Sequence, residues 1–269
     1  MGTMVCWRRM AIRILLIEAV DASSDHKKFE SVSEMLGLPM LAAWVRLRRP
    51  DDEIRIVDRD VPAALTAFRP HVVGISFVTP NFEIARAHAR AAQAAGAKVI
   101  AGGPHVTAIP LTLPPEMDVG VIGEGEATLE NLLSEYDRHG MTDLDRLAGV
   151  PGVVFRGADG RLLVVPRRAH LSLDDLPPPA RELMPPRRRG IMTSRGCPYR
   201  CSFCFQAHLE RKVRYASPRR VVGEMLEVAQ RTADLYPDVN RELLLAGIFL
   251  HDIGKVRELS YESGFGYTD

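Results

Sequence analysis

The sequence predicts an α/β protein built on a doubly wound parallel sheet. Between residues 10 and 138, short apolar runs of strand length alternate with segments of helical length. This alternation predicts parallel strands joined by right-handed helical crossovers, with helices on both faces of the sheet. With 46% hydrophobic and 26% charged residues, the composition is that of a globular protein with a buried core.

Each element of the predicted sheet has its own local pattern. Asn81 and Thr128 are expected N-caps, and Gly96 is an expected helix stop. The predicted strands are Ile12–Ile17, Ile54–Val57, Val72–Phe77, Lys98–Ala101 and Val119–Ile122. The predicted helices are Ser33–Arg48, Val61–Phe68, Asn81–Ala95 and Ala127–Arg138.

Beyond residue 140 the pattern changes. Asp159-Gly160 lies between two apolar runs and predicts a hairpin over residues 152–166. Prolines crowd residues 171–186, which excludes a regular helix or a central strand and predicts a linker. A short strand is expected at Ile191–Ser194. Helices are expected from Ser217-Pro218 onward and at about Arg241–Leu250.

Charge, hydropathy and cysteine content narrow the classes of function. The net charge of +1 gives no overall field that would attract nucleic acid. No apolar stretch approaches the ~20 uncharged residues of a membrane span, so no membrane partner is expected. Three of the four cysteines lie close together in the sequence, which favours a metal site in a reducing cytoplasm over a disulfide framework.

Those cysteines are Cys197, Cys201 and Cys204, in the loop after the strand at Ile191–Ser194. Three thiolates at this spacing can each bind one iron of a 4Fe–4S cubane, which leaves the fourth iron open to another ligand. A zinc site with His208 as a fourth ligand is the alternative, although zinc usually takes two separated pairs of ligands.

The Arg-Gly-Cys197-Pro-Tyr-Arg-Cys201-Ser-Phe203-Cys204 segment resembles the cluster loop of the radical S-adenosylmethionine (SAM) superfamily. The resemblance implies that SAM binds the open iron and is cleaved reductively to a radical that attacks a small-molecule substrate. It also implies an electron donor such as flavodoxin or ferredoxin. Phe203 matches the aromatic position whose neighbourhood contacts the adenine of SAM.

The glycine-rich segments that follow the predicted strands form a second motif. Ser76 ends one strand, and Gly102-Gly103-Pro-His105 and Gly123-Glu124-Gly125-Glu126 follow two others. Ahead of a radical SAM loop, these segments resemble the Rossmann-like cobalamin-binding domain of cobalamin-dependent radical SAM proteins, over about residues 12–216. The resemblance implies a pocket for the nucleotide tail of cobalamin. The residues implied for this pocket are Ser76, Gly102, Gly103, Gly123, Glu124 and Gly125.

Two histidines bear on how cobalamin would bind. Many cobalamin proteins carry Asp-x-His-x-x-Gly in the first loop, where the histidine binds cobalt. This chain has Asp25-His26 without that spacing, so no histidine–cobalt bond is expected. His105 is interpreted as a turn residue and not as a ligand.

A third motif lies near the C-terminus. The segment from Leu235 through His251-Asp252 to Asp269 resembles HD-domain phosphohydrolases, of the type attached to 3′→5′ exoribonucleases. The resemblance implies that His251 and Asp252 bind a divalent metal that activates water. Glu224 stands about where that family's earlier histidine would fall, and the later ligands are absent. This metal site is therefore expected to be incomplete.

Four segments are expected in the chain. They are an α/β cobalamin-binding-like domain at 10–140, a hairpin and proline-rich linker at 141–186, the start of a radical SAM βα barrel at 187–220, and a helical HD-like fragment at 221–269. A complete barrel needs about six βα units of ~30 residues, far more than follow Ile191. The chain is therefore expected to be truncated or chimeric, with a junction near residues 217–230.

The leading functional hypothesis is a cobalamin-dependent radical SAM enzyme that transfers a methyl group or rearranges its substrate. One alternative is an HD-type metal-dependent phosphohydrolase or exoribonuclease fragment. The other is a cobalamin-binding module without catalysis.

Overall fold

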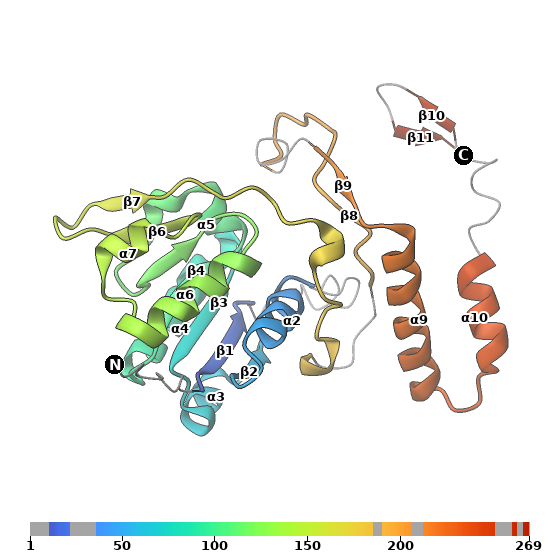
Figure 1. Ribbon diagram of the computed structural model, residues 1–269, viewed down its shortest axis with the longest axis horizontal. Helices are drawn as coiled ribbons and strands as arrows, with labels where there is room; N and C mark the ends of the chain where they lie inside the picture. The colour runs from blue at the N-terminus through green and yellow to red at the C-terminus, as the bar shows by residue number, and fades with distance from the viewer. Residues whose placement is uncertain are drawn as a thin grey trace, which may run out of the picture.

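The computed structural model describes residues 11–21, 36–184, 190–205, 212–250, 260–262 and 266–268. The predicted doubly wound sheet is confirmed: seven strands follow the order β2-β1-β3-β4-β5-β6-β7 (Figure 1). The parallel strands are β1 (Arg13–Glu18), β2 (Glu53–Val57), β3 (Val72–Ser76), β4 (Lys98–Gly102) and β5 (Val119–Val121). The predicted hairpin adds β6 (Val153–Arg156) and β7 (Leu162–Val164) as an antiparallel edge.

Helices cover both faces of the sheet and form two separate cores. On one face lie α2 (Gly37–Arg48), α6 (Glu126–His139) and α7 (Leu144–Ala148). On the other lie α3 (Val61–Phe68), α4 (Phe82–Ala94) and α5 (Pro104–Ala108). Neighbouring residues of a strand point to opposite faces, so Leu16 joins the first core and Leu15 the second. A strand buried on both faces explains the continuous apolar run at β1.

The order of the strands fixes where a ligand can enter. The chain leaves β1 and pairs β2 on one side of it, then crosses over to pair β3 on the other side. The connections after β1 and β3 therefore lead to opposite faces, which opens a crevice at the carboxyl ends of these strands. The glycine-rich segments after β4 and β5 lie at the same edge.

Local differences from the sequence predictions are informative. Thr128 was predicted as an N-cap, and this is wrong: α6 begins at Glu126 after Gly125, and the Thr128 hydroxyl donates to the carbonyl of Pro151 from inside the helix. Asn81 holds the N-cap position of α4, but its side chain donates to the carbonyl of Ala19 instead of capping. Gly96 follows the end of α4 with φ +83°, as expected for a helix stop.

The described part of the linker holds only two short 3-10 turns, η3 (Leu173–Asp175) and η4 (Arg181–Leu183), as the prolines predicted. The short strand expected at Ile191–Ser194 lies slightly later, as β8 (Ser194–Arg195), and pairs antiparallel with β9 (Arg214–Tyr215). The cysteine loop lies between these two strands.

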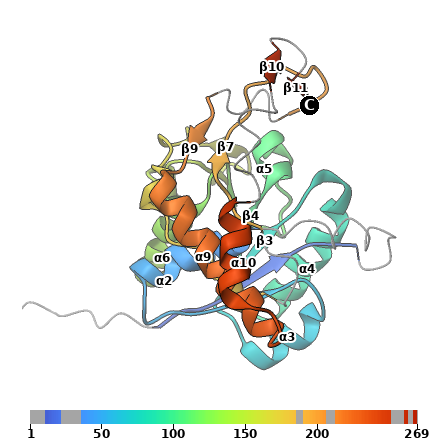
Figure 2. The ribbon, with the colours of Figure 1, turned by 90° about the vertical axis from the view of Figure 1, so that its right-hand side faces the viewer.

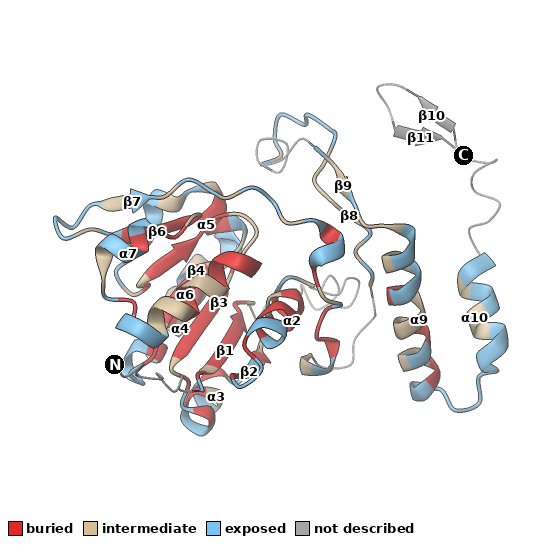
Figure 3. Ribbon diagram, in the orientation of Figure 1, coloured by how far each residue is buried: buried red, intermediate tan, exposed pale blue. Residues whose placement is uncertain are grey.

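Two further helices follow. α9 (Pro218–Leu235) is capped by Ser217, whose hydroxyl accepts from the backbone N–H of Arg220, so the predicted cap is confirmed. α10 (Arg241–Leu250) runs beside α9 (Figures 1 and 2). Buried residues concentrate around the seven-stranded sheet, whereas none of the residues of α10 is buried (Figure 3). The backbone of β10 (Ser260–Glu262) and β11 (Gly266–Thr268) forms a small hairpin.

Within the described residues, none of the helices combines the length and the apolar character that a membrane crossing requires.

Candidate functional site

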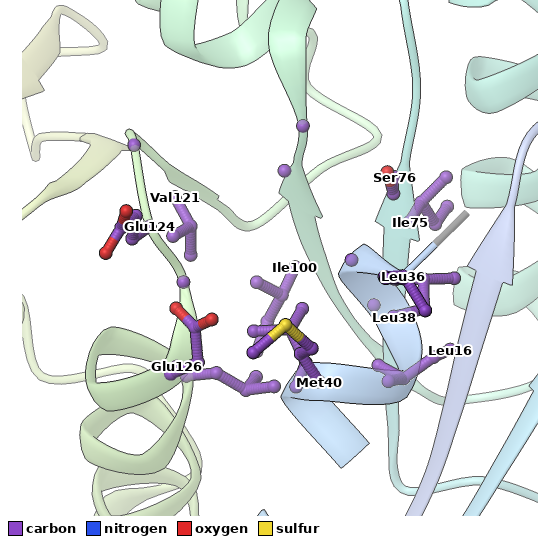
Figure 4. A pocket seen from close by; sticks show the side chains of 18 of the residues that line it. Leu16, Leu36, Leu38, Met40, Ile75, Ser76, Ile100, Val121, Glu124 and Glu126 are labelled. Atoms are coloured by element: carbon purple, nitrogen blue, oxygen red, sulfur yellow. The ribbon is translucent and has the colours of Figure 1, made fainter. Parts of the chain in front are cut away.

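A cavity of about 320 Å³ lies at the carboxyl ends of the parallel strands. Ser76 of β3 and the segment after β4 form one side, and the loop 123–126 after β5 forms the opposite side (Figure 4). α2 contributes apolar side chains, among them Leu38 and Met40. The cavity therefore combines an apolar lining with a rim of glycines and a few polar groups, as small-molecule sites commonly do.

Two glycines at this rim, Gly102 and Gly103, are required for different structural reasons. A Cβ atom on Gly102 would meet no atom within 4 Å, so a side chain there would project into open space beside the cavity. Gly103 has φ +90°, and a Cβ atom there would lie 2.9 Å from the backbone nitrogen of Phe77. Gly102 keeps the cavity open, whereas the backbone conformation at 103 requires glycine.

The end of β1 places a buried carboxyl group near the cavity. Glu18 is only 8% exposed, and the Ser76 hydroxyl donates to it over 3.4 Å. Burial raises the pKa of Glu18 to about 7, the Ser76 hydrogen bond lowers it somewhat, and the nearby charge of Asp58 raises it further. Sequence reasoning missed Glu18, because a charged residue that ends an apolar run has no local mark of burial.

Two arginines connect the loop 123–126 to the strands that flank the cysteines. Arg195 of β8 reaches Glu124 over 3.1 Å and Glu126 over 2.6 Å. Arg214 of β9 pairs with the other carboxylate oxygen of Glu124. His170 also lies 3.4 Å from Glu124. Glu124, implied by the cobalamin resemblance, therefore lines the cavity and also contacts the cysteine-bearing segment.

The cysteine loop lies against its own stem. Gly196 has φ +100°, and a Cβ atom there would collide with the Lys212 carbonyl. Cys197 and Cys204 are partly buried, Cys201 is exposed, and the N–H of Cys204 donates to the Cys201 carbonyl over 3.1 Å. Among the residues that the structure describes, no three His, Cys, Asp or Glu side chains are gathered as metal ligands. The three thiols are the donors that the sequence predicts for a cluster, but they are not gathered as a ligand set in this structure.

Phe203 and His105, which the sequence also indicated, lie in very different surroundings. Phe203 is 91% exposed and makes no described ring contact. His105 is buried in α5, with its ring nitrogens 3.1 Å from the Thr79 hydroxyl and 3.0 Å from that of Thr112. The interpretation of His105 as a turn residue is wrong, because it lies inside α5, and burial lowers the pKa of its ring. His26, His208, His251 and Asp252 lie outside the described residues.

The residues around the cavity fit a flat apolar ring such as the base of the cobalamin tail. The walls of the cavity are mostly apolar, and Gly102 lets a ligand approach the backbone closely. Glu124, Glu126 and Arg195 supply polar groups at one end.

Comparison with known proteins shows that the part of the chain that forms most of the cavity is similar to cobalamin-binding domains. Residues 27–133 match the family model of the B12 binding domain. The chain is 29% identical over 237 residues to an uncharacterized methyltransferase of Pyrococcus horikoshii, a match that covers 80% of this chain and 50% of that protein. It is 30% identical over 186 residues to the anaerobic magnesium-protoporphyrin IX monomethyl ester cyclase of Rubrivivax gelatinosus, covering 64% of this chain and 33% of that protein.

Solved structures share the fold. The cobalamin-dependent SAM radical enzyme OxsB, with aqua-cobalamin and SAM bound, aligns with a TM-score of 0.62 at 18% identity, covering 82% of this chain and 32% of that one. The radical SAM methyltransferase TsrM from Kitasatospora setae, with cobalamin and a [4Fe-4S] cluster bound, also gives 0.62 at 18% identity, covering 93% and 53%.

A short segment of the chain is similar to a different class of protein. Over 47 residues the chain is 57% identical to the 3′-5′ exoribonuclease YhaM of Listeria monocytogenes, covering 18% of this chain and 15% of that protein. This chain spans half or less of the length of the curated relatives named here.

Proposed function

We propose that this chain carries the cobalamin-binding module and the cluster loop of a cobalamin-dependent radical SAM enzyme. The enzyme would transfer a methyl group to a small-molecule substrate or rearrange its carbon skeleton, in a reducing cytoplasm, with electrons from a flavodoxin or ferredoxin. One observation carries the proposal: a cavity lined mostly by residues of the B12-binding match adjoins the stem of a three-cysteine loop.

The residues have distinct roles in this proposal. Gly102 and Gly103 admit the cobalamin tail beside Ser76, and the apolar side chains of α2 exclude water from it. Cys197, Cys201 and Cys204 hold the cluster, and Phe203 lies beside the adenine of SAM. When bound, these cofactors supply methyl transfer and one-electron chemistry, while the protein supplies orientation and a dry site.

In this proposal the chain divides into four segments. The cobalamin-binding unit would span 10–140, the hairpin and linker 141–186, and the start of the radical SAM unit 187–220. Residues 221–269 would form a fragment related to HD domains.

Anaerobic reconstitution tests the proposal. We expect about four irons per chain and one hydroxocobalamin per chain. Cys201→Ala should abolish the visible absorption of the cluster and leave hydroxocobalamin binding intact. Cys6→Ala is the matched control, since this fourth cysteine lies far from the loop in the sequence. One tightly bound zinc in place of iron, or no hydroxocobalamin binding, would refute the proposal.

The short similarity to an exoribonuclease favours a second candidate function, metal-dependent hydrolysis of RNA or nucleotides at His251 and Asp252. Its test is manganese-dependent release of nucleotides from an RNA oligomer by the purified chain. Asp252→Asn should remove that release, and Cys201→Ala should not change it.

A further inference from the structure

The loop 123–126 contacts both strands that flank the cysteines. Arg195 and Arg214 are direct partners in the β8–β9 register, and opposed residues of an antiparallel pair point to the same face. Both guanidinium groups reach Glu124, one to each carboxylate oxygen, and Arg195 also reaches Glu126 over 2.6 Å. A single loop at the cavity therefore holds the entry and the exit of the cysteine loop together.

These contacts are sheltered and their charges balance. The side chains of Arg195 and Arg214 are 15% and 16% exposed, Glu124 is 22% exposed and Glu126 only 4%. Two cations meet two carboxylates, with His170 at the edge of the group. Charge-assisted hydrogen bonds in such partly buried places are stronger than exposed ion pairs. Arg214 also donates to the Leu171 carbonyl over 2.8 Å, which adds the linker to the same group.

The ladder between β8 and β9 cannot hold this stem in place by itself. It contains two residue pairs, and an isolated hairpin of two strands is at best marginally stable in water. The stem is separate from the seven-stranded sheet, and among the described residues no third strand pairs with it. Apolar packing of Met192 and Ala216 against the cluster of Met40 and Trp44 also holds this segment. The carboxylates of the loop 123–126 add the ion pairs that connect the stem to the cavity.

We propose that Glu124 and Glu126 are positioning residues that lock the stem of the cysteine loop to the rim of the cavity. Because these glutamates and Arg195 also line the cavity, a ligand bound there and a metal group bound at the cysteines are kept at a fixed separation. The identity of the two groups rests on the proposed function. The lock itself rests only on the four side chains.

Hydrogen exchange on the full chain without added cofactors tests the lock directly. Glu124→Gln and Glu126→Gln should each speed exchange in peptides containing β8 and β9 by about tenfold, the equivalent of one charge-assisted hydrogen bond. Exchange in β4 should not change. Glu124→Asp keeps the charge and should restore part of the protection. Glu53→Gln is the matched control, because Glu53 pairs with Arg55 over 2.9 Å at the opposite edge of the sheet.

A second measurement separates positioning from simple stabilisation. In the wild type, saturating hydroxocobalamin should slow exchange at the ends of β3 and β4 and also in β8 and β9. In the Glu124→Gln/Glu126→Gln double variant, hydroxocobalamin should still slow exchange at the ends of β3 and β4 but should no longer slow it in β8 and β9. A merely structural ion pair would leave this transmission intact.

The outcomes distinguish the two proposals. If β8 and β9 exchange in both glutamine variants at the same rate as in the wild type, the lock is overturned, whatever the cavity binds. Equal transmission of protection in the wild type and the double variant also overturns it. A wild type that binds no hydroxocobalamin overturns the proposed function, and the measurement without cofactors then still decides on the lock.

Discussion

Replacing Glu18 by Gln should change how the stability of this protein depends on pH. Glu18 lies at the end of β1, 8% exposed, with a pKa raised to about 7 mainly by burial. The Ser76 hydroxyl compensates only in part over 3.4 Å, and Asp58 adds repulsion. Glutamine keeps the shape of the side chain and has no charge, so the substitution isolates the cost of ionising this carboxyl in place.

The sign and size follow from linkage. Below the unfolded pKa of 4.5 the carboxyl is protonated in both states, and its contribution to stability is fully present. Between 4.5 and about 7 only the folded protein keeps the proton, so stability falls as the pH rises. Above about 7 both states are ionised, and the folded state bears the whole cost, roughly 3 kcal/mol at ~1.4 kcal/mol per pKa unit.

Urea unfolding followed by circular dichroism at pH 5, 6, 7 and 8 measures this dependence. Between pH 5 and pH 8, the free energy of unfolding of Glu18→Gln should rise relative to the wild type by about 2.5 kcal/mol. Glu53→Gln, an exposed control, should follow the wild type. A difference between Glu18→Gln and the wild type that stays constant from pH 5 to pH 8 would refute the reasoning.

Three further substitutions test the cavity and the linker. Gly103→Ala should lower the free energy of unfolding by ~1–3 kcal/mol, since φ is +90° and Phe77 leaves no room. Gly102→Ala should leave urea unfolding unchanged and still weaken hydroxocobalamin binding in a spectral titration, because its methyl group enters the cavity; unchanged affinity would place the ligand elsewhere. Arg181→Met should cost ~3–5 kcal/mol by leaving the buried Glu224 without its cation. Arg181→Met/Glu224→Met should recover most of that loss, and a double variant as unstable as the single one would contradict this account.

The sheet could be predicted from the sequence because each strand is defined by its own residues. Four of the five parallel strands are apolar runs whose residues are mostly buried, β2 alternates exposed and buried residues, and each of the five overlaps its predicted range closely. The short helices α5 and α7 were not predicted, since five residues are too few to show a helical period. The N-cap of α6 was misplaced, since Thr128 lies inside the helix and its hydroxyl donates to the Pro151 carbonyl, a contact that no local pattern indicates.

The candidate site was predictable only where its residues belong to compact motifs. Gly102-Gly103 and the three cysteines are visible in the sequence as short patterns. The partners of Glu124 are not, because Arg195 and Arg214 lie far from it in the sequence and nothing in their local pattern indicates this pairing. The strength of an ion pair depends on the distance between the two charged groups in the folded protein, and the spacing of residues in the sequence does not give that distance.

The region around α9 also contains a long-range contact that the sequence did not reveal. Sequence reasoning placed a junction near residues 217–230, where Glu224 replaces an expected histidine. In the structure Glu224 is buried against Arg181 of the linker. Earlier in the same segment, the Ser217 N–H donates to Asp174 over 2.8 Å, and Arg220 donates to the Pro177 carbonyl over 3.2 Å.

These contacts fasten the first turns of α9 to the linker on both sides of residue 220. A buried arginine that loses its carboxylate is strongly destabilising, so the linker and α9 depend on each other for stability. Whatever the origin of the residues that follow, the stretch from Ser217 to Glu224 therefore packs against the proline-rich linker. The loss expected for Arg181→Met should accordingly be accompanied by faster hydrogen exchange in the first half of α9, whereas exchange in the seven-stranded sheet should change less.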